Sequence, residues 1–287
     1  MDFYLTALLQ GICFSSLALG IFISMKIFNI PDITTDGSYT LGAVVTAVMI
    51  RHQFPASIAL PVVILAGGLA GALTGIIHTK LKINALLAGI LVMTGLYSVN
   101  LSLMGTSNLP LNNAVTIFNQ LTLTSNANQN AFWIAIVFML LIALLIGYLL
   151  KTDFGIAMRA TGNSESMIRA LGVNTDRMKI TGLALANALT AVSGYLISQY
   201  QGFTDISMGI GIVIAGLGSV IIAESLINWW RITSVWLSLL LVLGGAIIFQ
   251  LVLAITLDIG VDANWLKGVT AMFVLVIVTL PRLRVAK

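Results

Sequence analysis

Residues 131–150, AFWIAIVFMLLIALLIGYLL, form an apolar run that contains no charged residue. A helix that crosses the hydrocarbon core of a bilayer needs about 20 mostly apolar residues. This run has that length, so it predicts a membrane-spanning α-helix.

The rest of the chain has the same character. Hydrophobic residues make up 59% of the 287 and charged residues only 8%, against roughly 25% charged in an ordinary globular domain. We therefore expect an all-α, polytopic transmembrane helix bundle of about nine spans, forming a single transmembrane domain over residues 1–287. The eight other predicted spans are 3–25, 37–50, 57–77, 85–104, 180–200, 206–223, 232–257 and 265–280.

The distribution of positive charge predicts the orientation, because Lys and Arg collect in cytoplasmic loops. With nine spans, only Arg51 and Lys267 fall on one side, and the other twelve of the 14 basic residues fall on the opposite side. This predicts an N-terminus outside and a C-terminus in the cytoplasm. The twelve are Lys26, Lys80, Lys82, Lys151, Arg159, Arg169, Arg177, Lys179, Arg231, Arg282, Arg284 and Lys287.

Two loops are long. Residues 105–130 form an uncharged external loop rich in Asn, and residues 151–179 form the most charged segment of the chain, on the cytoplasmic side. Inside the second loop we predict a short helix that Asn163 or Ser164 caps at its start. Gly172 can adopt the left-handed conformation that ends it.

The short helix needs support, because isolated helices of about two turns are marginal in water. Met167, Ile168 and Leu171 lie near one of its faces. That face suits insertion into a groove of a partner protein. The alternative is that it packs on the membrane surface or on neighbouring spans.

The segment before the shortest span, NIPDITTDGSYTLGA, is rich in polar and turn-forming residues. One interpretation is a broken second span, in which irregular backbone at membrane depth precedes a half-helix and lines a cavity. The other is an ordinary internal loop with Asp36 as an N-terminal cap.

Polar residues within spans are costly and are often functional. Such residues are densest beside the interrupted span, so we expect a substrate path there. Its candidate residues are Asp36, Tyr39, Thr94, Tyr97 and Asn100.

Four glycines interrupt the seventh span: Gly209, Gly211, Gly216 and Gly218. They predict close helix packing, since small residues let backbones approach each other in lipid.

Motifs of other protein classes are missing from the sequence. There is no GxxxxGK[ST] phosphate-binding loop, and the two histidines fall on opposite sides of the membrane. The single cysteine excludes an internal disulfide and a cysteine-based metal cluster. We therefore expect no catalytic residue, no metal site and no cofactor in this chain, and no nucleic-acid partner.

Several stretches resemble the permease subunits of ATP-binding-cassette (ABC) importers in the branched-chain amino-acid and ribose permease superfamily. The resemblance covers most of the chain and is closest to the branch grouped with tryptophan and tyrosine uptake. The stretches are IFNIPDITTDGSYTLGA, LAGILVMTGLYSVNLSLMGTSNLPL, TDISMGIGIVIAGLGSVIIAESL and AMRATGNSESMIRALGVNTDRMK.

This resemblance implies two permease copies, two cytoplasmic ATPase subunits that bind ATP and Mg²⁺, and an extracytoplasmic solute-binding protein. It also implies inward conduction of a small solute, an aromatic or branched-chain amino acid. It identifies the short helix as the ATPase-coupling helix, with residues Glu165, Met167, Ile168, Arg169, Leu171 and Gly172. The rival hypotheses are an ion-coupled secondary transporter or channel, and a structural membrane subunit without conduction.

Overall fold

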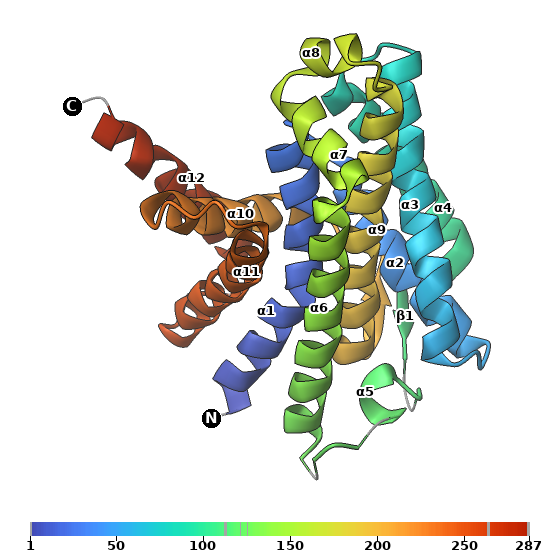
Figure 1. Cartoon of the computed structure of the whole chain (residues 1–287). Helices are drawn as coiled ribbons and strands as arrows, with labels where there is room; N and C mark the ends of the chain where they lie inside the picture. The colour runs from blue at the N-terminus through green and yellow to red at the C-terminus, as the bar shows by residue number, and fades with distance from the viewer. Residues whose placement is uncertain (1, 112–113, 121, 125, 263–264, 286–287) are drawn as a thin grey trace.

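The computed structural model describes residues 2–285 except 112–113, 121, 125 and 263–264. Over those residues the chain is a bundle of long helices with one small two-stranded sheet (Figure 1). The long helices are α1 (Asp2–Ile21), α2 (Thr34–Arg51), α3 (Ala56–Lys80), α4 (Ala85–Met104), α6 (Ala127–Lys151), α9 (Thr175–Gln201), α10 (Ile212–Trp229), α11 (Val235–Asp258) and α12 (Leu266–Val285). The short elements are the π-helical segment η1 (Phe22–Ile27), β1 (Asn108–Pro110), α5 (Ile117–Gln120), α7 (Asp153–Asn163), α8 (Glu165–Ala170) and β2 (Phe203–Asp205).

Two helices form the centre of the bundle. In α1 with η1 and in α9, 72% and 78% of the most apolar window is buried within the protein, against 22–39% in the other candidate spans. Helices α2 and α3 pack on α9, and α11 packs on α1. Helices α10, α11 and α12 lie together on the other side of α1 from α3 and α4 (Figure 1). Most of the outer helices therefore keep apolar side chains on their outward faces, as lipid requires.

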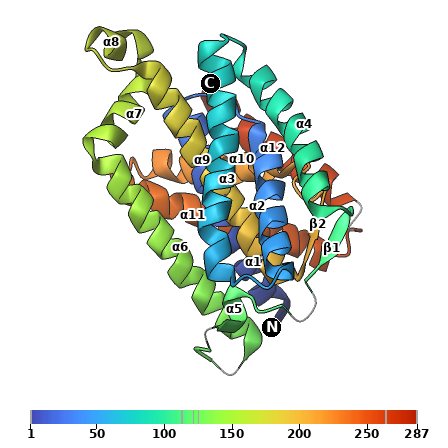
Figure 2. The same ribbon diagram turned by 90° about the vertical axis from the view of Figure 1, so that its right-hand side faces the viewer.

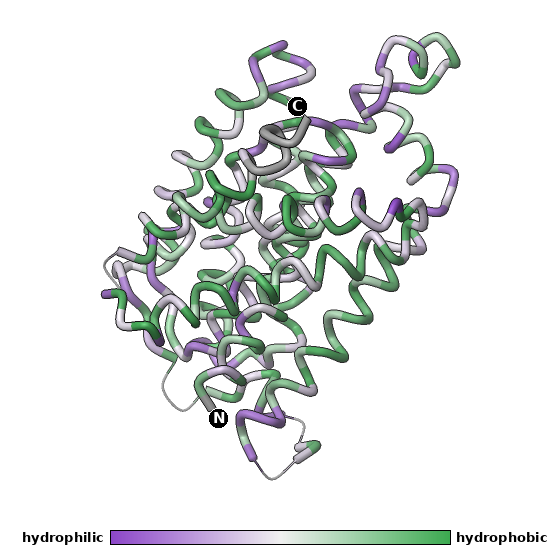
Figure 3. The backbone as a smooth tube through the Cα atoms, turned by 90° about the vertical axis from the view of Figure 1, so that its left-hand side faces the viewer, coloured by the Kyte–Doolittle hydropathy of each residue, from purple (hydrophilic) through white to green (hydrophobic). Residues whose placement is uncertain are grey.

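Hydropathy along the chain agrees with a bilayer as the surroundings. Apolar stretches run along the long helices, and many of the hydrophilic stretches lie at the turns between them (Figure 3). Seven helices of the described chain are long and apolar enough to cross a membrane, and α2 is not among them. Each of the nine predicted spans overlaps one of the nine long helices, and the count of nine crossings stays a prediction.

The two ends of the bundle differ. The N-terminus, α5 and β1 lie at one end, and α7 and α8 lie at the other (Figures 1 and 2). The C-terminal part of α12 points toward the α8 end. The start of α1 and the end of α12 thus lie toward opposite ends of the bundle. Which end faces the cytoplasm stays a prediction, and Lys287 falls outside the described residues.

Two predicted boundaries were wrong. Helix α10 begins at Ile212 rather than 206, because residues 206–211 form turns. The external loop ends before residue 130, because the Asn126 side chain accepts a hydrogen bond from Asn128 N (3.1 Å) and starts α6 there.

In the internal loop 151–179, α9 begins at Thr175 with Asn174 as its cap, which accepts a hydrogen bond from Arg177 N (3.0 Å). The prediction of Asn174 or Thr175 as the start of this helix is therefore confirmed. The loop also contains a helix that was not predicted, α7.

The sheet was not predicted either. Strand β1 pairs antiparallel with β2, with Asn108 opposite Asp205 and Pro110 opposite Phe203. Three-residue strands carry too little alternation to be detected from sequence. The pairing closes the loop after α4 onto the chain that follows α9.

Small residues let α2 lie close against α9. A Cβ atom at Gly42 of α2 would overlap the backbone carbonyl of Ala191, and one at Gly194 of α9 would overlap the carbonyl of Tyr39. Backbone atoms cannot move aside as a flexible side chain can. The spacing of α2 and α9 therefore depends on these glycines.

We predict that Gly42→Ala lowers the free energy of unfolding by about 1–3 kcal/mol, because the added methyl group overpacks a backbone contact. Thermal unfolding in detergent measures it. The matched control is Gly95→Ala in α4, where a Cβ meets nothing within 4 Å and which should be neutral or stabilising. Equal effects of the two substitutions would contradict this account of the packing.

Candidate functional site

A pocket of about 210 Å³ opens where α2, α4 and the turn before α10 meet. Four of the five residues predicted for the substrate path line it: Asp36, Thr94, Tyr97 and Asn100. Its other lining residues are Gly37, Thr40, Met93, Ile206, Gly209 and Ile210.

The fifth candidate, Tyr39, is not among the lining residues. It is fully buried, and its ring stacks on Phe14 of α1 with centroids 5.9 Å apart. Asp36 and Thr40 are four residues apart and share one face of α2, whereas Tyr39 is rotated about 100° away from Thr40. The prediction of Tyr39 as a path residue is therefore wrong in its placement, and its ring belongs to the core.

Asp36 connects α2 to α10. Its two carboxylate oxygens accept hydrogen bonds from the backbone N–H groups of Gly211 and Val213, each at 2.9 Å. Free N–H groups at the start of a helix favour a negative group. Asp36 is thus a cap, as one interpretation of the sequence expected, but it caps α10 and not its own helix.

The start of α2 is held by a residue that sequence reasoning missed. Asp32 is 3% exposed, and its oxygens accept from Thr34 N (2.9 Å) and from Asn187 Nδ2 (2.6 Å). Ser38 donates to Asn187 Oδ1 at 2.7 Å. Asn187 is near the middle of α9, so the irregular segment before α2 lies within the bundle, as the broken-span interpretation expected.

The one signal of this cluster in the sequence is that Asp32 directly follows Pro31. Proline favours an extended residue before it and cannot continue a helix, so an acidic residue directly after it is well placed to cap the next helix. The sequence alone does not reveal that Asn187, 155 positions later, is the partner.

On α4, three polar residues face the pocket in different environments. Thr94 donates to its own helix at Ile90 O (2.8 Å), and Tyr97 is 48% exposed. Asn100 is 1% exposed, and its Nδ2 donates to Gly37 O at 3.4 Å. Polar groups from two helices thus meet at one small, mostly apolar hollow.

The four glycines of the seventh span differ in their surroundings. A Cβ at Gly209 would overlap the Asp36 carbonyl and the Thr40 hydroxyl, one at Gly216 would meet Ile21, and one at Gly218 would meet Phe249. Gly211 instead has φ +83° and open space around it. Glycine suits this position because the residue before α10 has a left-handed backbone conformation. Close helix packing is not the reason.

At the α8 end, the predicted short helix is present as α8, with Gly172 in the left-handed conformation at φ +86°. Its start lies at Ser164, whose side chain forms no capping hydrogen bond. Met167 and Leu171 are 63% and 69% exposed, so neither packs on the bundle. These two exposed apolar side chains form the Met167–Leu171 face.

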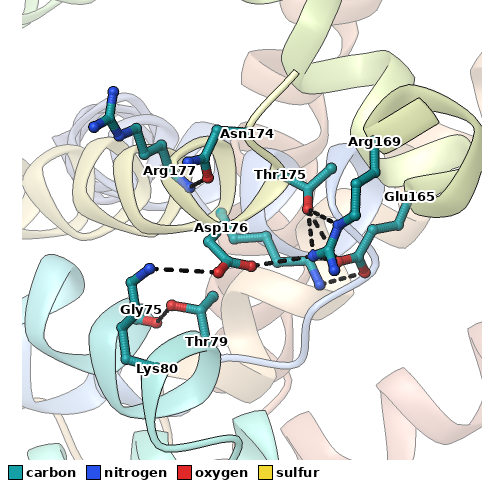
Figure 4. Close-up of polar contacts among 10 residues, drawn as sticks. Gly75, Thr79, Lys80, Glu165, Arg169, Asn174, Thr175, Asp176 and Arg177 are labelled. Carbon is teal, nitrogen blue, oxygen red and sulfur yellow. Dashed lines mark hydrogen bonds and ion pairs between the residues drawn. The ribbon is translucent and has the colours of Figure 1, made fainter. Parts of the chain in front are cut away.

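Ion pairs fix α8 to the bundle (Figure 4). Glu165 pairs with Arg169 (3.0 Å) and with Lys179 of α9, and Arg169 also reaches Asp176 at 3.3 Å. Asp176 in turn pairs with Lys80 at the end of α3 (3.5 Å). This network, the α8 ion-pair cluster, links one short helix to two spans.

Hydrogen bonding by Lys179 is the main cause that lowers the pKa of Glu165 below its ordinary value, with Thr175 and Arg169 adding to it. A carboxylate with a lowered folded pKa stabilises the folded state above its ordinary pKa. That contribution is lost as the pH falls through the lowered folded pKa.

We predict that Glu165→Gln loosens α8 at neutral pH, because the charge partner of Lys179 is removed. Limited proteolysis in the segment 164–174 measures it. The difference between wild type and variant should be constant at neutral pH and should shrink only as the pH falls below 4.5, the ordinary pKa of Glu, and through the lowered pKa of the folded protein. A difference that does not shrink there would contradict the role of the ionised carboxylate.

Among the described residues, no three His, Cys, Asp or Glu side chains gather as metal ligands. The described residues provide a small pocket between α2, α4 and the start of α10, and an exposed helix that is ion-paired to the bundle at one end.

Two known permease proteins are similar to this chain in sequence. The tyrosine transport system permease protein of Clostridioides difficile is 35% identical over 275 residues, which cover 96% of this chain and 90% of that protein. The autoinducer 2 import system permease protein of Escherichia coli is 26% identical over 207 residues, 72% of this chain and 59% of that protein.

A solved structure described as an inward-facing conformation of a metal-chelate type ABC transporter has a similar fold. Its TM-score is 0.50 at 17% identity, covering 94% of this chain and 81% of that chain. The family model described as "branched-chain amino acid transport system / permease component" matches residues 3–279. The chain therefore belongs to this family, and it is a multi-pass permease subunit of an ABC transport system in the cytoplasmic membrane.

Proposed function

We propose that this subunit conducts an aromatic or branched-chain amino acid inward. The observation that carries the proposal is the pocket between α2, α4 and the start of α10, which has apolar walls and a few polar groups. Small-molecule sites commonly combine these two features. The likeness to a tyrosine transport permease supports the choice of an amino acid.

Within this proposal, Asp36, Thr94, Tyr97 and Asn100 line the path that the solute takes. A second, identical copy of the chain completes the path, and an extracytoplasmic binding protein delivers the solute to it. The α8 end faces the cytoplasm and the N-terminus faces outward, as twelve of the 14 basic residues favour.

The energy comes from ATP and Mg²⁺ bound by separate ATPase subunits, which dock on α8. The Met167–Leu171 face is their contact, because it is apolar, exposed and carried on a helix that ion pairs hold in place. For ATP to drive transport, the docked ATPase must favour one arrangement of the spans over another. An anchored α8 can pass such a difference on to α9 and α3.

The test is uptake into proteoliposomes that contain the permease, its ATPase and its binding protein. We expect ATP-dependent accumulation of labelled tyrosine, tryptophan or leucine. Met167→Asp with Leu171→Asp should abolish both ATPase co-purification and uptake, because two buried charges would oppose docking.

The matched control exchanges the two residues, Met167→Leu with Leu171→Met, which keeps the face apolar and should keep both activities. Uptake that follows an ion gradient without ATPase would instead favour a secondary transporter. Unchanged ATPase co-purification by the charged double variant would contradict the proposed role of the Met167–Leu171 face.

A further inference from the structure

The oxygen of Asn100 is the one pocket-lining polar atom whose hydrogen-bonding capacity is buried and unused. Asn100 is 1% exposed, and its Oδ1 has no hydrogen-bond partner within the described part of the chain. The orientation of the amide is set by its other end. Nδ2 faces the Gly37 carbonyl, which can only accept, so the nitrogen belongs there and the oxygen lies on the other side.

The other polar groups of the pocket have mostly used their protons. The hydroxyl groups of Thr94 and Thr40 donate to carbonyls of their own helices, Ile90 O and Asp36 O. What they still offer is lone pairs. The two Asp36 oxygens accept from the start of α10. Tyr97 alone retains a hydroxyl proton to donate at the exposed side of the pocket.

The ionisable residues of the lining also favour hydrogen-bond donors over acceptors on the solute. Asp36 is the only acidic residue of the lining, and none of the lining side chains is Lys, Arg or His. A solute bound here therefore meets hydrogen-bond acceptors at its polar end, and Met93, Ile206 and Ile210 along its apolar body.

We propose that Asn100 Oδ1 receives an N–H of the transported solute, and that the group bound there is the ammonium of an amino acid. This inference rests on the proposed function and adds to it the direction in which the solute lies in the pocket. The ammonium end enters toward Asn100. The carboxylate, for which the lining offers no cation, stays at the exposed rim near Tyr97 and Ile210.

This polarity can be tested by direct binding, apart from transport. Three probes share one phenol ring: tyramine carries an ammonium group, 3-(4-hydroxyphenyl)propanoate carries a carboxylate, and 4-ethylphenol carries neither. Their affinities are measured by microscale thermophoresis on the permease–ATPase complex in lipid nanodiscs. We expect tyramine to bind most tightly and the carboxylate probe least tightly.

Replacing the acceptor should remove the preference. Asn100→Leu, which is close in size, should weaken tyramine about tenfold or more and leave 4-ethylphenol unchanged. Ser98→Ala is the matched control, because Ser98 is on the same helix and does not line the pocket; it should change neither affinity. Thermal unfolding and ATPase co-purification check that each variant is assembled.

Equal tyramine affinity in wild type and Asn100→Leu would overturn the proposal, as would tighter binding of the carboxylate probe. If Asn100→Leu does not assemble, the order of the three probes on the wild-type complex still decides. Failure of the proposed function is a separate result, since it appears as absent amino-acid uptake in proteoliposomes whatever the order of the probes.

Discussion

The hydrogen bond between Asp32 and Asn187 is the contact on which the arrangement of the bundle depends. A carboxylate buried among membrane helices is costly unless its oxygens are paired, and Asp32 has two neutral donors, Thr34 N and Asn187 Nδ2. The pairing lets irregular backbone enter the bundle and turn into α2 midway along α9. With a continuous helix instead, the carboxylate of Asp36 would not be placed at the start of α10.

The same short region connects the two parts of the molecule that the proposed function needs. Asn187 lies twelve residues after Thr175 on α9, or about 18 Å along the helix axis. The α8 ion-pair cluster holds α8 to the first turn of α9 through Asp176 and Lys179. A displacement of α9 at α8 can therefore reach the start of α2, whose next turn forms one wall of the pocket. Such coupling transmits a signal only if the bundle has two arrangements that ATP binding distinguishes.

Much of the fold follows from the sequence, because apolar length is a strong signal in a membrane protein. The run 131–150 and the segment 85–104 correspond closely to α6 and α4. The start of α10 was displaced because Ile206 and Ile210 are apolar yet lie in the turns that end at the left-handed Gly211. Hydropathy cannot distinguish an apolar turn inside a bundle from an apolar helix.

The candidate site was partly predictable for a related reason. Thr94, Tyr97 and Asn100 stand out because polar residues are rare in spans, and the interruption near Pro31 marks the neighbouring segment. Tyr39 was misplaced because a polar residue in a short span does not reveal which face it occupies. Asp32 was missed because its role depends on Asn187, a partner that only the folded chain brings near.

The most direct test of this account is a double-mutant cycle on that pair, with Asp32→Ala, Asn187→Ala and the double variant unfolded in mixed micelles. The account predicts an interaction free energy of about 0.5–3 kcal/mol, as for residues in one buried network. Once Asp32 is gone, the loss of Asn187 should therefore cost less. Losses that simply add, within about 0.5 kcal/mol, would mean that the two side chains do not hold α2 to α9.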